Sequence, residues 1–338
     1  MATDGSNAPE ALRPEELSTF NFPLSTFHPK PQTGMPDSIA VAIVHGSGQK
    51  EPDFADEIIE TLKTMFPAAL PEEKRDAAAL EIEPVYWADL PRKREEDIWQ
   101  RVKDSGPMDQ LGLRRYIFNL AGDTLAYQPS KGRRELYVAV HEVMAEAFGR
   151  LADRVGPEVP LCVLSHSMGT IVTHNYLYDM QRGSEGVIVE GAAENQLPQP
   201  DTPLERGETL ALFVTYGSPL AIWRLRFGDD YKAIRFPGSA AEELYPELEP
   251  RWLNVYDADD VIGYPIGRLT ESYAELTEKG YLEDRQRNVG SFWKSWNPLS
   301  HKGYFRDESS LEELAGYLAG VWQGAFGEGT GERERQGS

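Results

Sequence analysis

Short apolar segments alternate with helical periodicity through most of this 338-residue chain, and this alternation restricts the possible folds more than any other feature. A strand, a helix and a second strand in succession are typical of βαβ units, which build a parallel sheet covered by helices on both faces. We therefore predict an α/β protein with a doubly wound, mostly parallel sheet of about six strands. Ligands of such sheets bind beyond the carboxyl ends of the strands.

The apolar segments predict where the strands lie, and the periodicity predicts the helices. Strands are expected at residues 39–44, 80–87, 160–164, 209–216, 251–256 and, more weakly, 288–293. Helices are expected at residues 54–65, 133–155 and 167–180. Two insertions, near 88–132 and 183–207, interrupt the pattern. We interpret the first as a helical cap or lid over the site and the second as a surface excursion.

Composition predicts the domain boundaries and excludes several classes of partner. Residues 1–37 form an expected irregular arm, 38–326 one α/β domain, and 327–338 a disordered tail. The net charge of −21 disfavours nucleic acid and anionic membranes as partners. No segment has the roughly 20 apolar residues of a membrane helix, and the N-terminus lacks the apolar core of a signal peptide. We therefore expect a cytoplasmic protein without integral membrane association.

The single cysteine, Cys162, lies in an apolar segment and is expected to be a buried core residue. One cysteine excludes an intrachain disulfide and a cluster of thiolate metal ligands. We expect neither a metal nor a cofactor.

A serine at the end of the third expected strand is a candidate catalytic residue. The segment from Leu164 to Gly169 reads Leu-Ser-His-Ser-Met-Gly, and an apolar helix follows it. Strand, tight turn and helix form the context of a nucleophile elbow, in which small residues must flank the serine at two positions on either side. Ser167 is therefore the predicted nucleophile, with Gly169 on one side and Ser165 where glycine is more usual. Ser165 is the rival nucleophile, and a helix-capping serine is the structural alternative.

A serine nucleophile needs a base, and the base needs an acid that orients it. His301 stands in a loop with Pro and Gly nearby, and it is the predicted base among six histidines. Asp257, Asp259 and Asp260 crowd one loop after the fifth expected strand, and mutual repulsion opposes burial of all three. Asp260 is the preferred acid, because the apolar pair after it could bury it, and Asp257 is the second choice.

An oxyanion hole needs two backbone N–H donors. One is expected from Met168, directly after the nucleophile, and the other from Ser47, in the His-Gly-Ser-Gly segment after the first strand. Gly46 in that segment allows close approach to a substrate. A phosphate loop is the alternative, but the segment lacks the Lys-Ser/Thr pair of a P-loop and the spacing of a dinucleotide site.

Together these segments resemble the α/β-hydrolase superfamily, particularly its esterase-like and lipase-like members, over roughly residues 38–306. The order Ser, Asp, His is the order of that family. The resemblance implies Ser167 at the top of the sheet, Asp260 and His301 on later loops, and acyl transfer to water. It also implies that the substrate-binding floor includes Gly217, Ser218 and Pro219.

We therefore predict a serine hydrolase that cleaves a carboxylic ester of a small molecule or a lipid-like compound. Residues 111–120, with Tyr116, Ile117 and Phe118, could form an apolar wall for the acyl group or could equally be core. Amide, thioester and lactone hydrolysis, and acyl transfer to another alcohol, stay open on the same triad. A catalytically inactive hydrolase fold that serves as a binding module is the alternative from another class.

Overall fold

The sheet of the computed structural model has six strands, and every neighbouring pair is parallel. The structure describes residues 37–48, 51–128, 134–182, 197–228, 231–288, 304 and 308–327. The strands follow one another across the sheet in the order β2-β1-β3-β4-β5-β6. Their bounds are Asp37–Val44 (β1), Ala78–Val85 (β2), Leu161–His166 (β3), Leu210–Tyr216 (β4), Arg251–Tyr256 (β5) and Leu282–Gln286 (β6).

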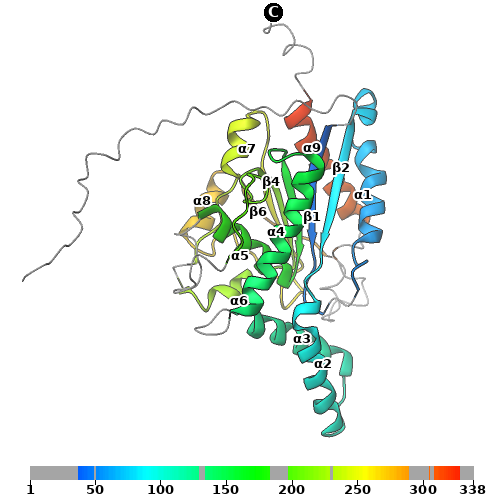
Figure 1. Cartoon of the computed structure of the whole chain (residues 1–338), viewed down its shortest axis with the longest axis vertical. Helices are drawn as coiled ribbons and strands as arrows, with labels where there is room; N and C mark the ends of the chain where they lie inside the picture. Colours follow the sequence, from blue (N-terminus) through cyan, green and yellow to red (C-terminus); the bar gives the residue numbers. More distant parts are fainter. Residues whose placement is uncertain are drawn as a thin grey trace, which may run out of the picture. The chain divides into compact units, whose positions relative to one another are not determined.

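Helices cover both faces of the sheet, with α4 and α5 on one side of the strands and α1 and α9 on the other (Figure 1). The longer helices are Asp56–Ala68 (α1), Asp89–Asp104 (α2), Leu111–Tyr127 (α3), Glu135–Val155 (α4), Met168–Arg182 (α5) and Glu308–Phe326 (α9). The shorter ones are Leu220–Arg224 (α6), Ser239–Leu244 (α7), Glu271–Glu278 (α8) and the 3₁₀ helix Glu72–Ala77 (η2). The predicted α/β class, with a parallel sheet of six strands, is confirmed.

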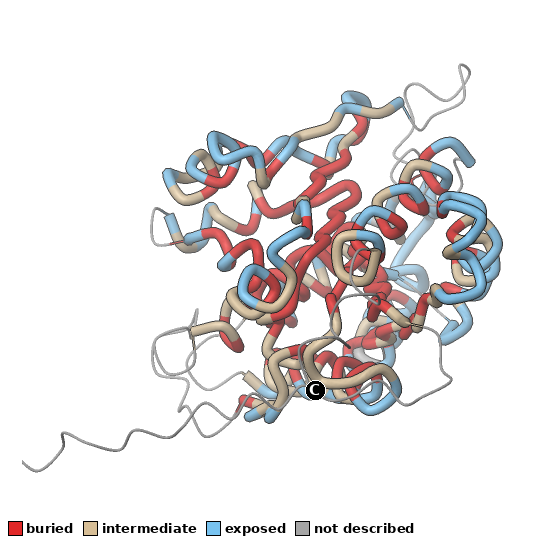
Figure 2. Tube along the Cα trace, turned by 90° about the horizontal axis from the view of Figure 1, so that it is seen from above, coloured by how far each residue is buried: buried red, intermediate tan, exposed pale blue. Residues whose placement is uncertain are grey.

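β1 and β4 are apolar on both sides because both faces of the sheet are covered. In β1, Val41 and Ile43 pack into the layer under α1 and α9, whereas Ala40 and Ala42 pack into the layer under α4 and α5. Figure 2 shows the result as a buried band of strands between helices whose outer faces are exposed. Cys162 is buried in β3, and burial raises the pKa of its thiol.

The sixth strand differs from the prediction. Residues 289–293 of the expected strand lie outside the described residues, and the structure forms β6 earlier in the chain. β6 has the polar sequence Leu-Glu-Asp-Arg-Gln because it is an edge strand, which pairs on one side alone and tolerates charged side chains. Apolar periodicity cannot detect such a strand.

The first insertion folds into α2 and α3, which lie beyond the end of the sheet at which β1 and β2 finish (Figure 1). Of the second insertion, residues 197–207 are described, and 183–196 lie outside the described residues. So do residues 1–36 of the expected arm and 328–338 of the expected tail. Among the helices that the structure describes, none combines the length and the apolar character that crossing a membrane requires.

Candidate active site

The turn after β3 holds Ser167 in an unusual backbone conformation. β3 ends at His166 and α5 begins at Met168, so Ser167 is the single residue between strand and helix. Its φ of 54° lies in the left-handed region, which a residue with a side chain rarely occupies. The Ser167 amide donates to the carbonyl of Tyr216 at 2.9 Å, which fastens the turn to the end of β4. Strain of this kind persists where the surrounding structure enforces it, typically at functional sites.

The loop after β1 presses directly against this turn. A Cβ on Gly169 would lie 2.3 Å from the carbonyl oxygen of His45, and a Cβ on Gly46 would lie 2.6 Å from the Cβ of Ser167. Both distances are shorter than any ordinary contact. The two glycines therefore bring the predicted oxyanion loop and the predicted nucleophile into contact.

The two rival serines differ in the state of their hydroxyl groups. Ser165 is fully buried, and its hydroxyl lies 2.8 Å from that of Thr173, within hydrogen-bonding distance. Ser167 is 2 % exposed, and its hydroxyl has no hydrogen-bond partner among the described residues. Buried hydroxyl groups are nearly always hydrogen-bonded, so a hydroxyl without a partner indicates a group kept for another role.

The start of α5 favours negative charge beside Ser167. The first amides of a helix lack partners within the helix and carry a partial positive charge. α5 has 15 residues and begins at Met168, so its amino end lies next to the serine. Ser47 lies in the turn after β1, beside Gly46. The structure thus brings the predicted donor loop to the amino end of α5.

Two buried histidines have both ring nitrogens occupied and cannot act as the base. His45 contacts the carbonyl of Gly46 through Nδ1 at 2.7 Å and accepts the amide of Trp87 at Nε2 at 3.1 Å. Burial lowers the pKa of His45 to about 4. His174 contacts the hydroxyls of Tyr231 and Tyr273, each at 2.9 Å, and burial lowers its pKa to about 3.

The other histidines divide between the core, the end of β3 and the part of the chain outside the described residues. His141 contacts the carbonyl of Tyr137 at 2.9 Å and the carboxylate of Asp179 at 3.3 Å, so it belongs to the core. His166 is the last residue of β3, next to Ser167. His28 and His301, the predicted base, lie outside the described residues. The structure therefore argues against His45, His141 and His174 as the base, and it does not test His28 or His301, the predicted base.

The loop after β5 buries two of its three aspartates. Asp257 is 2 % exposed and Asp260 is 5 % exposed, whereas Asp259 is exposed. Asp260 accepts the hydroxyl of Tyr304 at 2.8 Å and the amide of Ile262 at 2.9 Å. Asp257 accepts the amide of Asp259 at 2.9 Å. The expectation that repulsion keeps at least one of the three at the surface is met.

Tyr304 connects this acidic loop to the nucleophile turn, and sequence analysis did not single it out. Its hydroxyl donates to Asp260 and accepts the amide of Asp257 at 2.9 Å. Its ring lies 6.0 Å from the ring of His166, between centroids. Burial, reinforced by the charge of Asp260, raises the pKa of Tyr304, so the hydroxyl stays a donor. An aromatic residue three positions after the predicted base was the signal in the sequence.

The residues expected at the floor lie under the nucleophile turn. Gly217, Ser218 and Pro219 follow β4 and are all buried. The Ser218 hydroxyl lies 2.8 Å from that of Thr170, in the first turn of α5. A Cβ on Gly263 would lie 2.9 Å from Gly217 and 2.8 Å from Asp260, so the loops after β4 and β5 touch here.

α3 covers the site from the side of the first insertion. The Thr124 hydroxyl lies 3.8 Å from the sulfur of Met168, and a Cβ on Gly48 would lie 2.9 Å from the amide nitrogen of Asn119. Phe118 packs on Trp99 of α2, with ring centroids 5.2 Å apart, whereas Ile117 is exposed. Part of the 111–120 segment is therefore interior to the helix pair and part faces outward.

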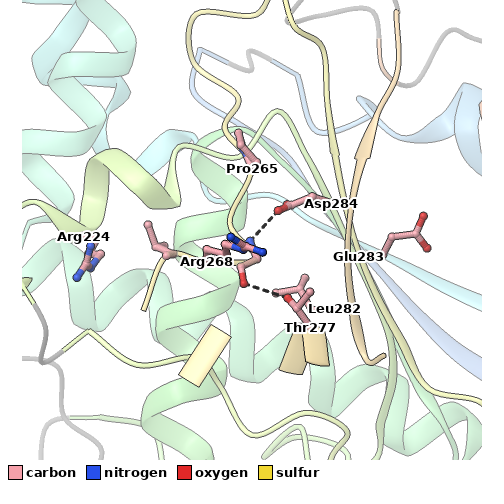
Figure 3. A pocket seen from close by; sticks show the side chains of 9 residues that line it. Arg224, Pro265, Arg268, Thr277, Leu282, Glu283 and Asp284 are labelled. Atoms are coloured by element: carbon pink, nitrogen blue, oxygen red, sulfur yellow. Dashed lines mark hydrogen bonds between the residues drawn. The ribbon is translucent and has the colours of Figure 1, made fainter. Parts of the chain in front are cut away.

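A cavity of about 630 Å³ lies elsewhere, between α8, β6 and the loop after β5 (Figure 3). Asp284 accepts the amide of Gly267 at 2.7 Å, and Thr277 donates to the carbonyl of Gly267 at 3.0 Å. These bonds hold the loop against β6. None of the residues that line this cavity belongs to the Ser167 turn or to the loop after β1.

Comparison with known proteins adds no assignment. No protein-family model matches the chain, and no curated protein matches it either. The geometry around Ser167 is therefore the basis for inferring a function.

Proposed function

We propose that this protein is a serine hydrolase of the α/β-hydrolase kind, which cleaves a carboxylic ester through an acyl-enzyme on Ser167. One observation carries the proposal. Ser167 stands alone between a buried strand and the amino end of a helix, with φ at 54° and a buried hydroxyl that no described residue engages. A nucleophile elbow needs this conformation, because it lifts the serine side chain above the strand ends.

The strand order supports the position of the site. After β1, the chain adds β2 on one side of it in the sheet. From β3 onward, the chain adds β4, β5 and β6 on the opposite side. The topological switch point, where this direction reverses, therefore lies between β1 and β3. Ligands of open parallel sheets bind at that point, beyond the carboxyl ends of the strands. The loop after β1 and the turn after β3 carry Ser47 and Ser167, the two positions that the proposal needs there. The six-stranded parallel sheet is compatible with an α/β-hydrolase.

In the proposed mechanism, His301 takes the proton of Ser167 as the serine attacks the ester carbonyl. The amides of Met168 and Ser47 stabilise the oxyanion, and Asp260 orients the imidazole. The leaving alcohol takes its proton from His301, and water then hydrolyses the acyl-enzyme on Ser167 to release the acid. His301 precedes Tyr304 by three residues, which span at most about 11 Å. Since Tyr304 donates to Asp260, the chain allows His301 to reach the acid.

Labelling with a fluorophosphonate tests the proposal directly. Such a probe phosphonylates an activated serine, so we expect one adduct on the peptide that contains Ser167, identified by mass spectrometry. Heat-denatured protein is the control, because it lacks the assembled site. A folded protein that takes no label would favour a catalytically inactive fold that serves as a binding module.

Two matched variants test which aspartate is the acid. We expect Asp260→Asn to lower kcat by about 10³-fold, because the amide cannot stabilise the imidazolium that forms on the base. Asp257→Asn should cause a small decrease, since Asp257 accepts the amide of its own loop at 2.9 Å. Steady-state kinetics on a soluble ester distinguishes them. The reverse order of effects would make Asp257 the acid.

The outer face of the helix pair α2–α3 favours an ester with an apolar group. Of the ten large apolar side chains that are exposed among the described residues, six lie on α2 and α3. Residues 89–127 contain seven basic and seven acidic residues, so this segment is neutral in a chain of net charge −21. Ser167 is 2 % exposed, and α3 contacts the adjacent Met168 through Thr124, so substrate entry requires the residues that cover the serine to move. We propose that α2–α3 acts as a lid that contacts aggregated, lipid-like substrate.

Substitutions on this face distinguish an effect on binding to aggregated substrate from an effect on the catalytic step. Ile117 is 54 % exposed and Leu125 is 72 % exposed, so their replacement by serine leaves the core unchanged. We expect the double variant to hydrolyse micellar long-chain esters several-fold more slowly, because apolar area that would be buried on contact is lost. Rates on a soluble short-chain ester should stay unchanged. Leu225→Ser, which is 84 % exposed and lies outside α2 and α3, is the control.

A further inference from the structure

A buried tyrosine joins the loop after β5 to the ends of β3 and β4. Tyr304 is 1 % exposed, and its ring centroid lies 5.9 Å from that of Tyr216 and 6.0 Å from that of His166. Tyr216 is the last residue of β4, and its carbonyl accepts the amide of Ser167 at 2.9 Å. The ring of Tyr304 therefore lies beside the two strand ends that hold the proposed nucleophile.

The partners of the Tyr304 hydroxyl fix the direction of its hydrogen bonds. The amide of Asp257 can only donate, and the hydroxyl oxygen accepts it at 2.9 Å. The hydroxyl proton is donated to Oδ2 of the Asp260 carboxylate, at 2.8 Å. A second donor, the amide of Ile262, reaches Oδ1 of the same carboxylate at 2.9 Å. Since each oxygen of Asp260 has its own donor, the orientation of the carboxylate is fixed.

The same hydroxyl distinguishes the two buried aspartates of this loop. It contacts Asp257 through the backbone amide and Asp260 through the carboxylate. A Cβ on Gly263 would lie 2.8 Å from Oδ2 of Asp260 and 2.9 Å from the Cα of Gly217, the first residue after β4. The carboxylate oxygen that accepts the tyrosine proton therefore lies close to the loop that follows β4.

We propose that Tyr304 is a positioning residue that holds the Asp260 carboxylate in place relative to the Ser167 turn. The same contact selects Asp260, rather than Asp257, as the acid of the triad. This inference rests on the proposed function. The ring of Tyr304 is located by the ends of β3 and β4, and its hydroxyl orients the carboxylate, so one side chain relates the acid to the nucleophile. In this role Tyr304 acts through Asp260 and is not itself a catalytic residue.

Tyr304→Phe keeps the ring and removes the hydroxyl. We expect kcat for a soluble ester to fall by about tenfold with little change in KM, because the carboxylate loses a donor and can rotate away from the base. Tyr176→Phe is the matched control, since Tyr176 is also buried and its hydroxyl donates to the carbonyl of Glu205, before β4, at 2.9 Å. This control should lose some stability and keep the wild-type kcat.

A double-mutant cycle with Asp260→Asn distinguishes positioning of the acid from a general loss of structure. If Tyr304 acts through Asp260, Tyr304→Phe should have little further effect on kcat once Asp260→Asn has removed the acid. An effect of the same size in both backgrounds overturns the inference, because the tyrosine then acts by another route. In the matching cycle with Asp257→Asn, the effects on kcat should add. Coupling to Asp257 in place of Asp260 also overturns the inference.

The rate of fluorophosphonate labelling separates this inference from the proposed function. We expect Tyr304→Phe to be labelled at Ser167 several-fold more slowly than wild type, and Tyr176→Phe at the wild-type rate. An unchanged rate in Tyr304→Phe overturns the positioning role and leaves the hydrolase proposal standing. A folded wild-type protein that takes no label overturns the proposed function, and the role of Tyr304 with it. Should Tyr304→Phe fail to fold, para-fluorophenylalanine at position 304 fills the space of the hydroxyl without donating a proton, and its labelling rate decides.

Discussion

Replacement of Ser167 by alanine is expected to lower kcat for ester hydrolysis by about 10³-fold or more, with the fold intact. The hydroxyl makes no hydrogen bond to any described residue, so its removal costs the folded state little. The variant lacks the nucleophile. The hydrolysis that remains is direct attack by water on the ester, which the oxyanion donors still accelerate. Kinetics with a soluble ester, together with circular dichroism, separates the loss of activity from any loss of fold.

Ser167→Gly is a second test of the nucleophile, because this variant is expected to be more stable and yet inactive. At φ 54° a serine is strained, whereas glycine adopts this conformation freely, so we expect the variant to gain about 1 kcal/mol in the free energy of unfolding. Urea denaturation measures the gain, and hydrolysis should still be lost.

Ser165→Ala is the control for this pair of variants. Its hydroxyl is engaged with Thr173 at 2.8 Å inside the core, so the variant should lose some stability and keep its activity. If Ser165→Ala abolished hydrolysis while Ser167→Ala retained it, the nucleophile would have been assigned to the wrong serine.

The fold was largely predictable because local sequence carries its pattern. Five expected strands, from 39–44 to 251–256, are present within two residues of the expected bounds. β1 and β4 are buried and apolar almost throughout, and β2, although it is an edge strand, keeps apolar residues at Leu80, Ile82 and Val85. β6 was not predictable in this way, because Leu282–Gln286 lies at the sheet edge and has a polar sequence. The first insertion was recognised by its failure to fit the alternation, but its two helices were not assigned.

The geometry of the candidate site was predictable where one short segment determines it. The Ser167 turn and the Gly46 loop were recognised because strand, turn and small residues occur together in the sequence. The place of Tyr304 three residues after the predicted base marks it as a candidate, but the sequence does not show that it reaches Asp260 from 44 positions away, because that contact is tertiary. His301 lies outside the described residues and stays a prediction.

The contact between Gly169 and the loop after β1 leads to the largest expected effect on folding. Gly169 is the second residue of α5, and a methyl group there would meet two backbone carbonyl oxygens, those of His45 at 2.3 Å and Val44 at 2.8 Å. Backbone atoms at the end of a central strand cannot turn aside as a flexible side chain can. Either β1 and its loop move away from the turn or α5 shifts along its axis.

We therefore expect Gly169→Ala to lower the free energy of unfolding by about 3 kcal/mol, at the upper end of what overpacking a tight interior costs. Urea denaturation measures this loss. Gly316→Ala in α9 is the matched control, because a Cβ at that exposed position meets nothing within 4 Å. It should gain about 0.5–1 kcal/mol from the higher helix propensity of alanine. Any folded Gly169→Ala protein should also have a lower kcat, since the displaced loop carries the Ser47 amide. Equal stability of the two variants would contradict the close approach of the loop and the nucleophile turn.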